Sequence, residues 1–151
     1  MYIGVYSAAA RTAVNAARSL IAQSGFQPDH VGIRRFRALA LERMGRADPR
    51  AVALRPLAGF IDFHSTSMCR DLVFHVQEHQ FTPRDVAALA RDAGCELLGF
   101  GLDDDALAAD YRRRNPGDPL VRDPARIAAF ERAYPHAFAA MYLALLRKSD
   151  A

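Results

Sequence analysis

The chain has 151 residues, of which 51% are hydrophobic and 25% are charged, a balance typical of one globular domain with a core of its own. Its 20 basic and 17 acidic residues leave a formal net charge of +3, too small to indicate a nucleic-acid partner by itself. No apolar run approaches the roughly 20 residues that span a bilayer, and the N-terminal residues lack the pattern of a signal peptide. We therefore expect no membrane partner and a cytoplasmic location.

The two cysteines, Cys69 and Cys95, stand alone, without a CxxC spacing or a third partner. They indicate neither a zinc finger nor a disulfide scaffold. We expect two buried thiols in a reducing compartment.

The first 25 residues predict a strand followed by a helix. Residues 2–6 are largely β-branched and aromatic, which favours a strand. Ser7 is predicted to cap a helix that runs through Ser24, and Gly25 is placed to end it.

Shorter helical segments follow up to residue 57. A helix is predicted after Pro28 and ends at Gly45, and residues 52–57 can form only a brief helical turn after the Asp-Pro break. The arginines of the longer helix fall largely opposite its apolar side, without interleaved aromatic residues; they are Arg34, Arg35, Arg37 and Arg43. They predict a solvated face rather than a nucleic-acid site.

Residues 62–82 hold three of the five histidines. Ser65 or Ser67 can cap a short helix whose apolar face is formed by Cys69, Leu72, Val73 and Val76. Thr82 is predicted to cap the next helix, with a proline at its first position. The polar residues between the two helices therefore lie at a helix-to-helix corner.

The second half of the chain mixes helices and strands. Periodicity and capping residues predict helices over 83–92, 103–114 and 123–134, with a plain loop over 115–119. Residues 95–100 are predicted to form a strand. The tail, 138–147, is ambiguous, because its alanines and leucines favour a helix whereas pairing with the earlier strands would make it a strand.

Several blocks of the chain carry a resemblance to a known family. They are Ile3-Gly4-Val5-Tyr6-Ser7 with Ala10-Arg11, Asp62-Phe63-His64-Ser65 through Cys69-Arg70-Asp71-Leu72, His75 to Thr82, Leu98-Gly99-Phe100, Leu102 to Asp105, and Met141-Tyr142 with Arg147-Lys148. These blocks resemble the C-terminal part of bacterial class I methyltransferases that use S-adenosylmethionine, of the kind often joined to tetratricopeptide repeats.

The resemblance implies an α/β fold, mostly helical by residue count, with a small three-stranded mixed sheet that is part of the methyltransferase sheet. The fifth strand would be residues 2–6, the sixth residues 96–100 and the seventh residues 140–147. Their spatial order would be 5-7-6. Residues 8–82 would be a large helical insertion in this single or partial domain, over the carboxyl ends of the strands where such sheets bind ligands. Residues 1–7 and 83–151 would form the methyltransferase-like C-terminal half.

The family's glycine-rich turn, ribose-binding acid and fourth strand precede the part that this chain resembles. We therefore expect the chain alone to bind no cofactor, and S-adenosylmethionine to bind only when the missing half is supplied. The fifth strand would have a bare edge. We expect the insertion to shield it, or a second copy or a separate cofactor-binding chain to pair with it.

Six residues are the candidates for a substrate-side site, as substrate-orienting or proton-handling groups: Ser7, His64, Arg70, His75, Glu78 and His79. No cofactor-binding or metal-binding residue is assigned. A purely structural interpretation is also open. In it, Arg70 and Asp71 form a local ion pair, His75 lies at a helix C-terminus, and Glu78 and His79 bond the next turn.

Two other functions remain open. The chain could be a non-enzymatic binding or scaffold domain. It could also be a zinc-dependent hydrolase, because residues 75–79 match H-x-x-E-H and would share a face on a helix, with His64 and Glu96 as candidates for a third ligand.

Overall fold

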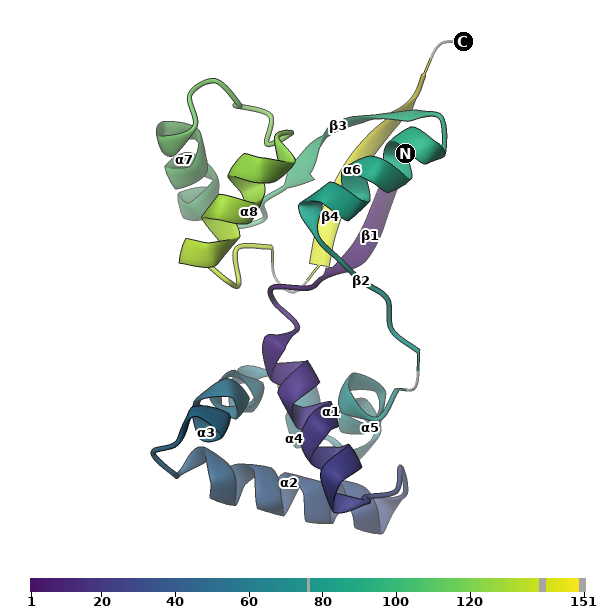
Figure 1. Cartoon of the computed structure of the whole chain (residues 1–151), viewed down its shortest axis with the longest axis vertical. Helices are drawn as coiled ribbons and strands as arrows, with labels where there is room; N and C mark the ends of the chain where they lie inside the picture. The colour runs from purple at the N-terminus through teal and green to yellow at the C-terminus, as the bar shows by residue number, and fades with distance from the viewer. Residues whose placement is uncertain (76, 139–140, 150–151) are drawn as a thin grey trace. The chain divides into compact units, whose positions relative to one another are not determined.

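The computed structural model describes residues 1–75, 77–138 and 141–149. The chain divides into two compact units, which we name the sheet unit (residues 1–11 and 79–151) and the helical unit (residues 12–78). Figure 1 shows all the strands in one group and a set of helices alone in the other. The helical unit starts and ends four residues inside the insertion predicted over 8–82. Within the described residues, no helix is both long enough and apolar enough to cross a membrane.

The sheet unit contains a mixed sheet. Its strands are β1 (Tyr2–Ser7), β2 (Gln80–Phe81), β3 (Cys95–Gly101) and β4 (Met141–Lys148), in the order β2-β1-β4-β3. β4 is antiparallel to both β1 and β3, whereas β2 is parallel to β1. The predicted α/β class and the order of the three long strands are confirmed.

The predicted number of strands is wrong, because the sheet has four. The missed strand, β2, pairs with only the last two residues of β1, Tyr6 with Gln80 and Ser7 with Phe81. Two residues carry no periodic signal. β2 exists because the chain returns beside β1, which the local sequence does not reveal.

The ambiguous tail forms a strand. β4 pairs with β1 on one side and with β3 on the other, so its backbone groups are used on both edges. Its buried residues alternate, with Tyr142, Ala144 and Leu146 facing the core. Tertiary pairing therefore overrides the helical preference of its alanines and leucines.

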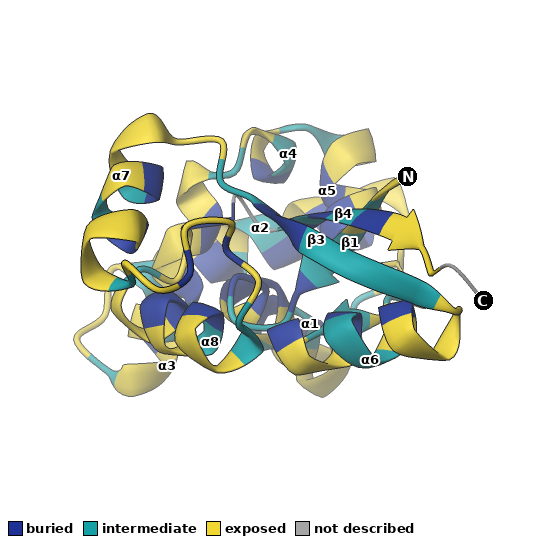
Figure 2. Ribbon diagram, turned by 90° about the horizontal axis from the view of Figure 1, so that it is seen from above, coloured by how far each residue is buried: buried dark blue, intermediate teal, exposed yellow. Residues whose placement is uncertain are grey.

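Three helices complete the sheet unit: α6 (Pro83–Asp92), α7 (Asp105–Arg114) and α8 (Pro124–Ala133). The core joins Val86 of α6, Tyr111 of α7 and Ile127 of α8 to the strand residues Phe100 and Tyr142. The burial colours in Figure 2 follow this pattern, since each of these helices has a buried side and an exposed side. α6 has the predicted bounds, with Thr82 as its N-cap.

The helical unit has a separate core. Its elements are α1 (Thr12–Ser24), α2 (His30–Met44), α3 (Pro49–Leu54), a 3-10 turn η1 (Arg55–Gly59), α4 (Ile61–His64) and α5 (Thr66–Val73). Phe36 and Phe63 lie at the centre of this core, with their ring centroids 6.2 Å apart in an edge-to-face arrangement. Val76, which the sequence places on the apolar face of the α5 segment, lies outside the described residues.

Two local predictions need correction. α1 begins at Thr12 and not directly after Ser7, because Ser7 closes a turn: its Oγ accepts a hydrogen bond from the Ala10 N–H at 3.2 Å, and its carbonyl accepts one from the Arg11 N–H at 3.2 Å. Of the two thiols predicted to be buried, Cys69 is buried but Cys95 is only half-buried, since it begins β3 at the end of the sheet.

Candidate functional site

The six candidate residues are divided between the two units. Ser7 ends β1 in the sheet unit and is fully buried, and His79, just before β2, is exposed. The other four lie in the helical unit. Of these four, Arg70 and His75 line the same hollow.

This first hollow has a volume of about 610 Å³, and the residues lining it are Pro28, Arg70, Asp71, Phe74, His75 and Gln77. A second hollow of about 580 Å³ adjoins it, because Pro28, Arg70 and Asp71 line both. His30 at the start of α2 and residues 65–67 at the start of α5 also line the second hollow. We call the two together the double hollow.

Arg70 and Asp71 are exposed residues of α5. The structural interpretation of the sequence pairs them, but they form no ion pair in the structure. Consecutive helical residues project about 100° apart, so their charged groups diverge. Within the described residues, neither side chain has a hydrogen bond or ion pair, and both charges face the double hollow.

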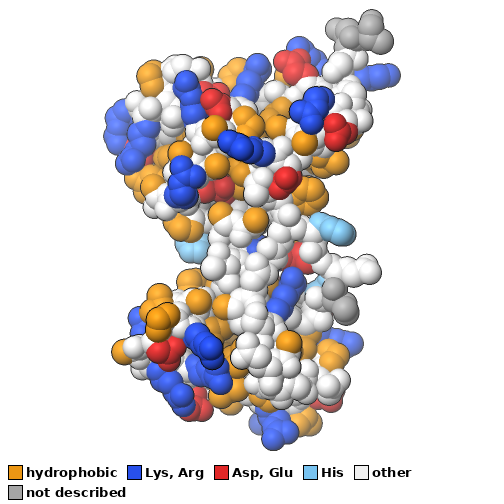
Figure 3. Space-filling model, in the orientation of Figure 1, with side chains coloured by type: hydrophobic (Ala, Val, Ile, Leu, Met, Phe, Trp, Pro, Cys, Tyr) orange, Lys and Arg blue, Asp and Glu red, His pale blue; other side chains and the backbone are white. Residues whose placement is uncertain are grey.

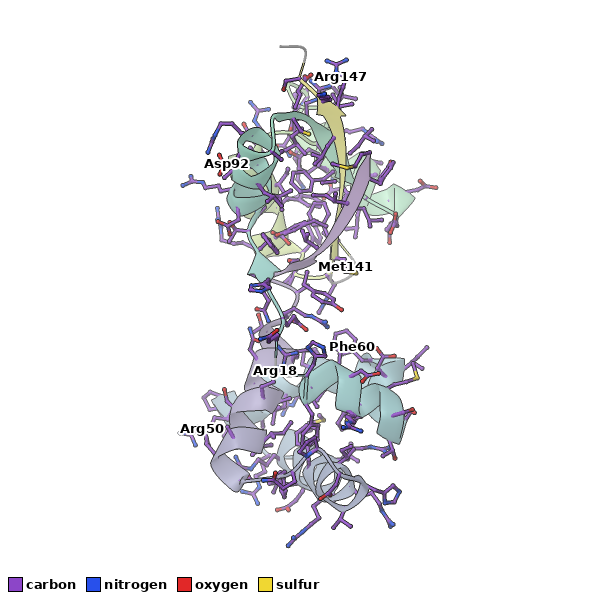
Figure 4. The ribbon with its side chains drawn as sticks, turned by 90° about the vertical axis from the view of Figure 1, so that its right-hand side faces the viewer. Arg18, Arg50, Phe60, Asp92, Met141 and Arg147 are labelled. Carbon is purple, nitrogen blue, oxygen red and sulfur yellow. The ribbon has the colours of Figure 1, made fainter. Side chains whose placement is uncertain are left out.

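Glu78 holds the chain segment that follows α5. Its carboxylate Oε2 accepts a hydrogen bond from Arg18 Nη2 at 2.9 Å, and its side chain is only 5% exposed. Arg18 projects from α1 (Figure 4) and also donates to the Leu72 carbonyl oxygen at 3.3 Å. Through these two hydrogen bonds, Arg18 links Leu72 near the end of α5 and Glu78 to α1.

His64 lies apart from the double hollow. Its Nε2 is 2.8 Å from the carbonyl oxygen of Ala58, and its ring packs edge-on against Phe63, with the centroids 5.4 Å apart. These contacts explain its position at the end of α4 without a ligand.

The H-x-x-E-H match does not form a shared helix face. α5 ends at Val73, and the described residues between 75 and 79 lie outside any helix. Glu78 is already paired with Arg18. Among the described residues, no group of three His, Cys, Asp or Glu side chains is arranged to hold a metal ion. In the described residues, the shared helix face that the zinc-hydrolase alternative needs is therefore not formed.

Ser7 belongs to a buried polar cluster in the sheet unit that the sequence did not reveal. Its Oγ donates a hydrogen bond of 2.8 Å to Oε1 of Glu131 on α8. The Tyr142 hydroxyl on β4 donates to the other carboxylate oxygen, Oε2. Glu131 is 4% exposed and the other two side chains are fully buried. We call these three residues the Ser7 cluster.

Burial controls the ionisation of the Ser7 cluster. It raises the pKa of Glu131 above its ordinary value, although the hydrogen bonds from Tyr142 and Ser7 act in the opposite direction. Burial, with the carboxylate of Glu131 beside it, also raises the pKa of Tyr142. One signal in the sequence could have indicated the cluster: Glu131 lies four residues after the core residue Ile127, on the inward face of its helix.

The predicted plain loop also contains a buried acid. Asp118 accepts hydrogen bonds from the Tyr111 hydroxyl at 2.6 Å and from the N–H groups of Arg122 at 2.9 Å and Asp123 at 3.0 Å. Burial raises the pKa of Asp118, but these hydrogen bonds outweigh it and hold that pKa below its ordinary value. Asp118 therefore organises the connection from α7 to α8, and it is not among the residues that line the double hollow.

The charged surface is mixed in sign. On the face seen in Figure 3, the arginines are spread over both units and are not gathered into one stripe.

Compared with known proteins, the chain matches no family model, and no curated protein matches its sequence. Its function is therefore argued from its own geometry.

Proposed function

We propose that the chain is the C-terminal, substrate-side portion of a methyltransferase that uses S-adenosylmethionine, and that it neither binds the cofactor nor catalyses on its own. The observation that carries the proposal is the strand order β1-β4-β3, with the last strand of the chain inserted antiparallel between two strands that are parallel to each other. This is the 5-7-6 order that the resemblance implies. Met141 and Arg147 mark the two ends of the inserted strand in Figure 4.

The connections support the same proposal. The chain leaves the sheet at the carboxyl end of β1, forms the helical unit, and returns through β2 to α6 and β3. Ligands of open α/β sheets bind beyond the carboxyl ends of the strands. A unit inserted at that point of the sequence is suited to select a substrate, and the double hollow is its candidate binding surface.

Two features of the sheet unit support the proposal that it binds no cofactor by itself. The turn after β1 contains Ala8, Ala9 and Ala10 and no glycine, so it does not offer the close backbone approach of a nucleotide-binding turn. The hydroxyl of Ser7, at the end of the same strand, is buried against Glu131. We therefore assign no cofactor-binding residue and derive no chemical step through the cofactor.

The outer edge of β1 is where we propose that a partner strand binds. Met1 exchanges hydrogen bonds with Leu146 on β4, and the Ala8 N–H donates to Phe81 on β2. Backbone direction alternates along a strand, so the N–H and C=O groups of Tyr2 and Gly4 face away from β4. In the described residues no strand pairs with them there. The partner is a second copy of the chain or a separate cofactor-binding chain.

The test is a titration with S-adenosylhomocysteine, followed by backbone amide chemical shifts, on the chain alone and on its complex with a chain that pairs with β1. We expect a folded spectrum without shifts for the chain alone and saturable binding by the complex. Saturable shifts at Tyr6 and Ser7 in the chain alone would contradict the absence of a cofactor site. A stable complex that ignores the ligand would favour the scaffold function instead.

The variant Gly4→Pro controls for the mode of pairing. Proline removes the outward N–H of Gly4 but leaves the hydrogen bonds between β1 and β4, because proline is tolerated on an edge strand whose N–H faces outward. Its Cβ would lie 3.1 Å from the flexible end of Met141, which can move. We expect this variant to fold and to lose the complex.

A further inference from the structure

The double hollow places two opposite charges side by side without a protein partner. Arg70 and Asp71 line both hollows, and within the described residues neither side chain has an ion pair or a hydrogen bond. Two neighbouring carboxylates have partners: Glu78 pairs with Arg18, and Asp29, which also lines the second hollow, caps α2 by accepting a hydrogen bond from the N–H of Gly32 at 2.7 Å. Arg70 and Asp71 are therefore a cation and an anion of the double hollow that no group in the described residues engages.

We propose that the double hollow binds a small zwitterion that carries a carboxylate and an amine, as an amino acid or a peptide terminus does, with Arg70 on the carboxylate and Asp71 on the ammonium group. One part of this proposal rests on the proposed function: that the zwitterion is the substrate which the helical unit selects. Binding itself can be measured without the cofactor.

The carboxylate side is defined by the second hollow. A guanidinium group is planar and matches a carboxylate through two parallel hydrogen bonds. Ser65, Thr66 and Ser67 line the same hollow, and hydroxyl groups can donate to the remaining lone pairs of a carboxylate. Ser65 and Ser67 lie close to each other, with their Oγ atoms 3.3 Å apart.

The first hollow defines the side chain of the ligand. Pro28 and Phe74 give it an apolar wall, and the Phe74 ring is fixed edge-on against the core residue Phe36, with the centroids 5.7 Å apart. This wall is formed before a ligand arrives, which reduces the entropic cost of binding. An aromatic amino acid therefore fits the two hollows together.

The test uses three probes that differ only in their charged groups: L-phenylalanine, 3-phenylpropanoate and phenethylamine. We expect L-phenylalanine to shift the amide signals of residues 65–75 in the described part of the chain saturably. We expect each singly charged probe to bind about tenfold more weakly, because each loses one charge-assisted hydrogen-bonding group. The absence of saturable shifts with L-phenylalanine would overturn the site.

Two variants separate the roles of the charges. Arg70→Gln should reduce binding of L-phenylalanine and 3-phenylpropanoate about tenfold and leave binding of phenethylamine unchanged. Asp71→Asn should reduce binding of L-phenylalanine and phenethylamine about tenfold and leave binding of 3-phenylpropanoate unchanged. Arg50→Gln, on α3 and outside both hollows, is the matched control and should bind like the unchanged chain. Equal affinities in all the variants would overturn the assignment.

The outcome is distinct from the test of the proposed function. If L-phenylalanine fails to bind while the complex binds S-adenosylhomocysteine, the zwitterion site is wrong and the methyltransferase proposal stands. If L-phenylalanine binds and the complex ignores S-adenosylhomocysteine, the site stands as a binding site without methyl transfer.

Discussion

At the scale of single residues, the buried carboxyl group of Glu131 links three elements of the sheet unit. It joins Ser7 at the end of β1 to Tyr142 on β4 from a position on α8. Asp85 on α6 adds a further negative charge that acts on Tyr142. Burial of an acid without a cation favours its protonated form, which is why the pKa of Glu131 is raised.

This predicts a specific pH dependence of stability. Because the pKa of Glu131 is above its unfolded value of 4.5, the folded chain holds an extra proton between the two values. Its contribution to the free energy of unfolding is therefore fully present below 4.5 and is lost as the pH rises through the raised pKa. Glu131→Gln should remove this component, as measured by urea unfolding at a series of pH values.

Glu96→Gln is the control for this measurement, since it removes a carboxylate from the same unit. Glu96 lies on β3, with its side chain 43% exposed, and pairs with Arg147. We expect this variant to keep the decline in stability with rising pH. A Glu131→Gln variant that shows the same decline as the unchanged chain would contradict the assignment.

At the scale of elements, α6 is an example of a helix defined by its local sequence. The Thr82 Oγ1 accepts a hydrogen bond from the Asp85 N–H at 3.3 Å, and the Asp85 carboxylate accepts one from the Thr82 N–H at 2.8 Å. Pro83 occupies the first turn, and Gly94, with φ +65°, follows its end. Each signal lies within a few residues of the helix, so the sequence predicted its bounds correctly.

Thr82→Ala should lower the free energy of unfolding by about 1 kcal/mol, because it removes the acceptor for a helix N–H. Thr82→Ser keeps the hydroxyl and should retain most of the stability, whereas Arg84→Gln, exposed on the same helix, should change it little. The hydrogen bonds from Thr82 hold the pKa of Asp85 below its ordinary value. The contribution of this cap is therefore lost as the pH falls through that pKa. The free energy of unfolding is measured with urea. Equal values for Thr82→Ala, Thr82→Ser and Arg84→Gln would contradict the role of the cap.

The strands contrast with α6, since their geometry depends on distant residues. β4 lies between strands that are about 50 and 140 residues away along the chain, and only those partners make it a strand. Gly99 is a single position whose requirement also depends on residues outside its own segment. A Cβ there would lie 2.2 Å from the Leu120 carbonyl oxygen, and the register of β3 against β4 shifts between Leu97 and Gly99. Locally, this glycine resembles any other residue of a short apolar run.

At the scale of the whole molecule, the two units have separate cores. Phe36 is fully buried in the helical unit, and Ile127 is fully buried in the sheet unit. Compact units with cores of their own open separately unless a large apolar interface joins them. Stability is therefore expected to be a property of each unit and not of the chain as one body.

Substitutions in each core should test this independence. Phe36→Ala should lower the stability of its unit by about 3–5 kcal/mol and speed amide hydrogen exchange within residues 12–78, while protection of the strands remains. Ile127→Ala, expected to cost about 2–5 kcal/mol, should have the reverse pattern. Equal loss of protection in both units after either substitution would mean that they unfold together.

The sequence by itself predicted the α/β class and the helices with local capping signals, and the order that it predicted for the three long strands agrees with the structure. Only the tertiary structure decided between helix and strand for the tail, and only it showed that β2 exists and that Ser7 meets Glu131. It also decided that Arg70 and Asp71 face one double hollow instead of each other. The physical reason is range: caps and helical periodicity act over a few residues, whereas strand pairing, burial of a carboxyl group and the walls of a hollow depend on residues far apart in the chain.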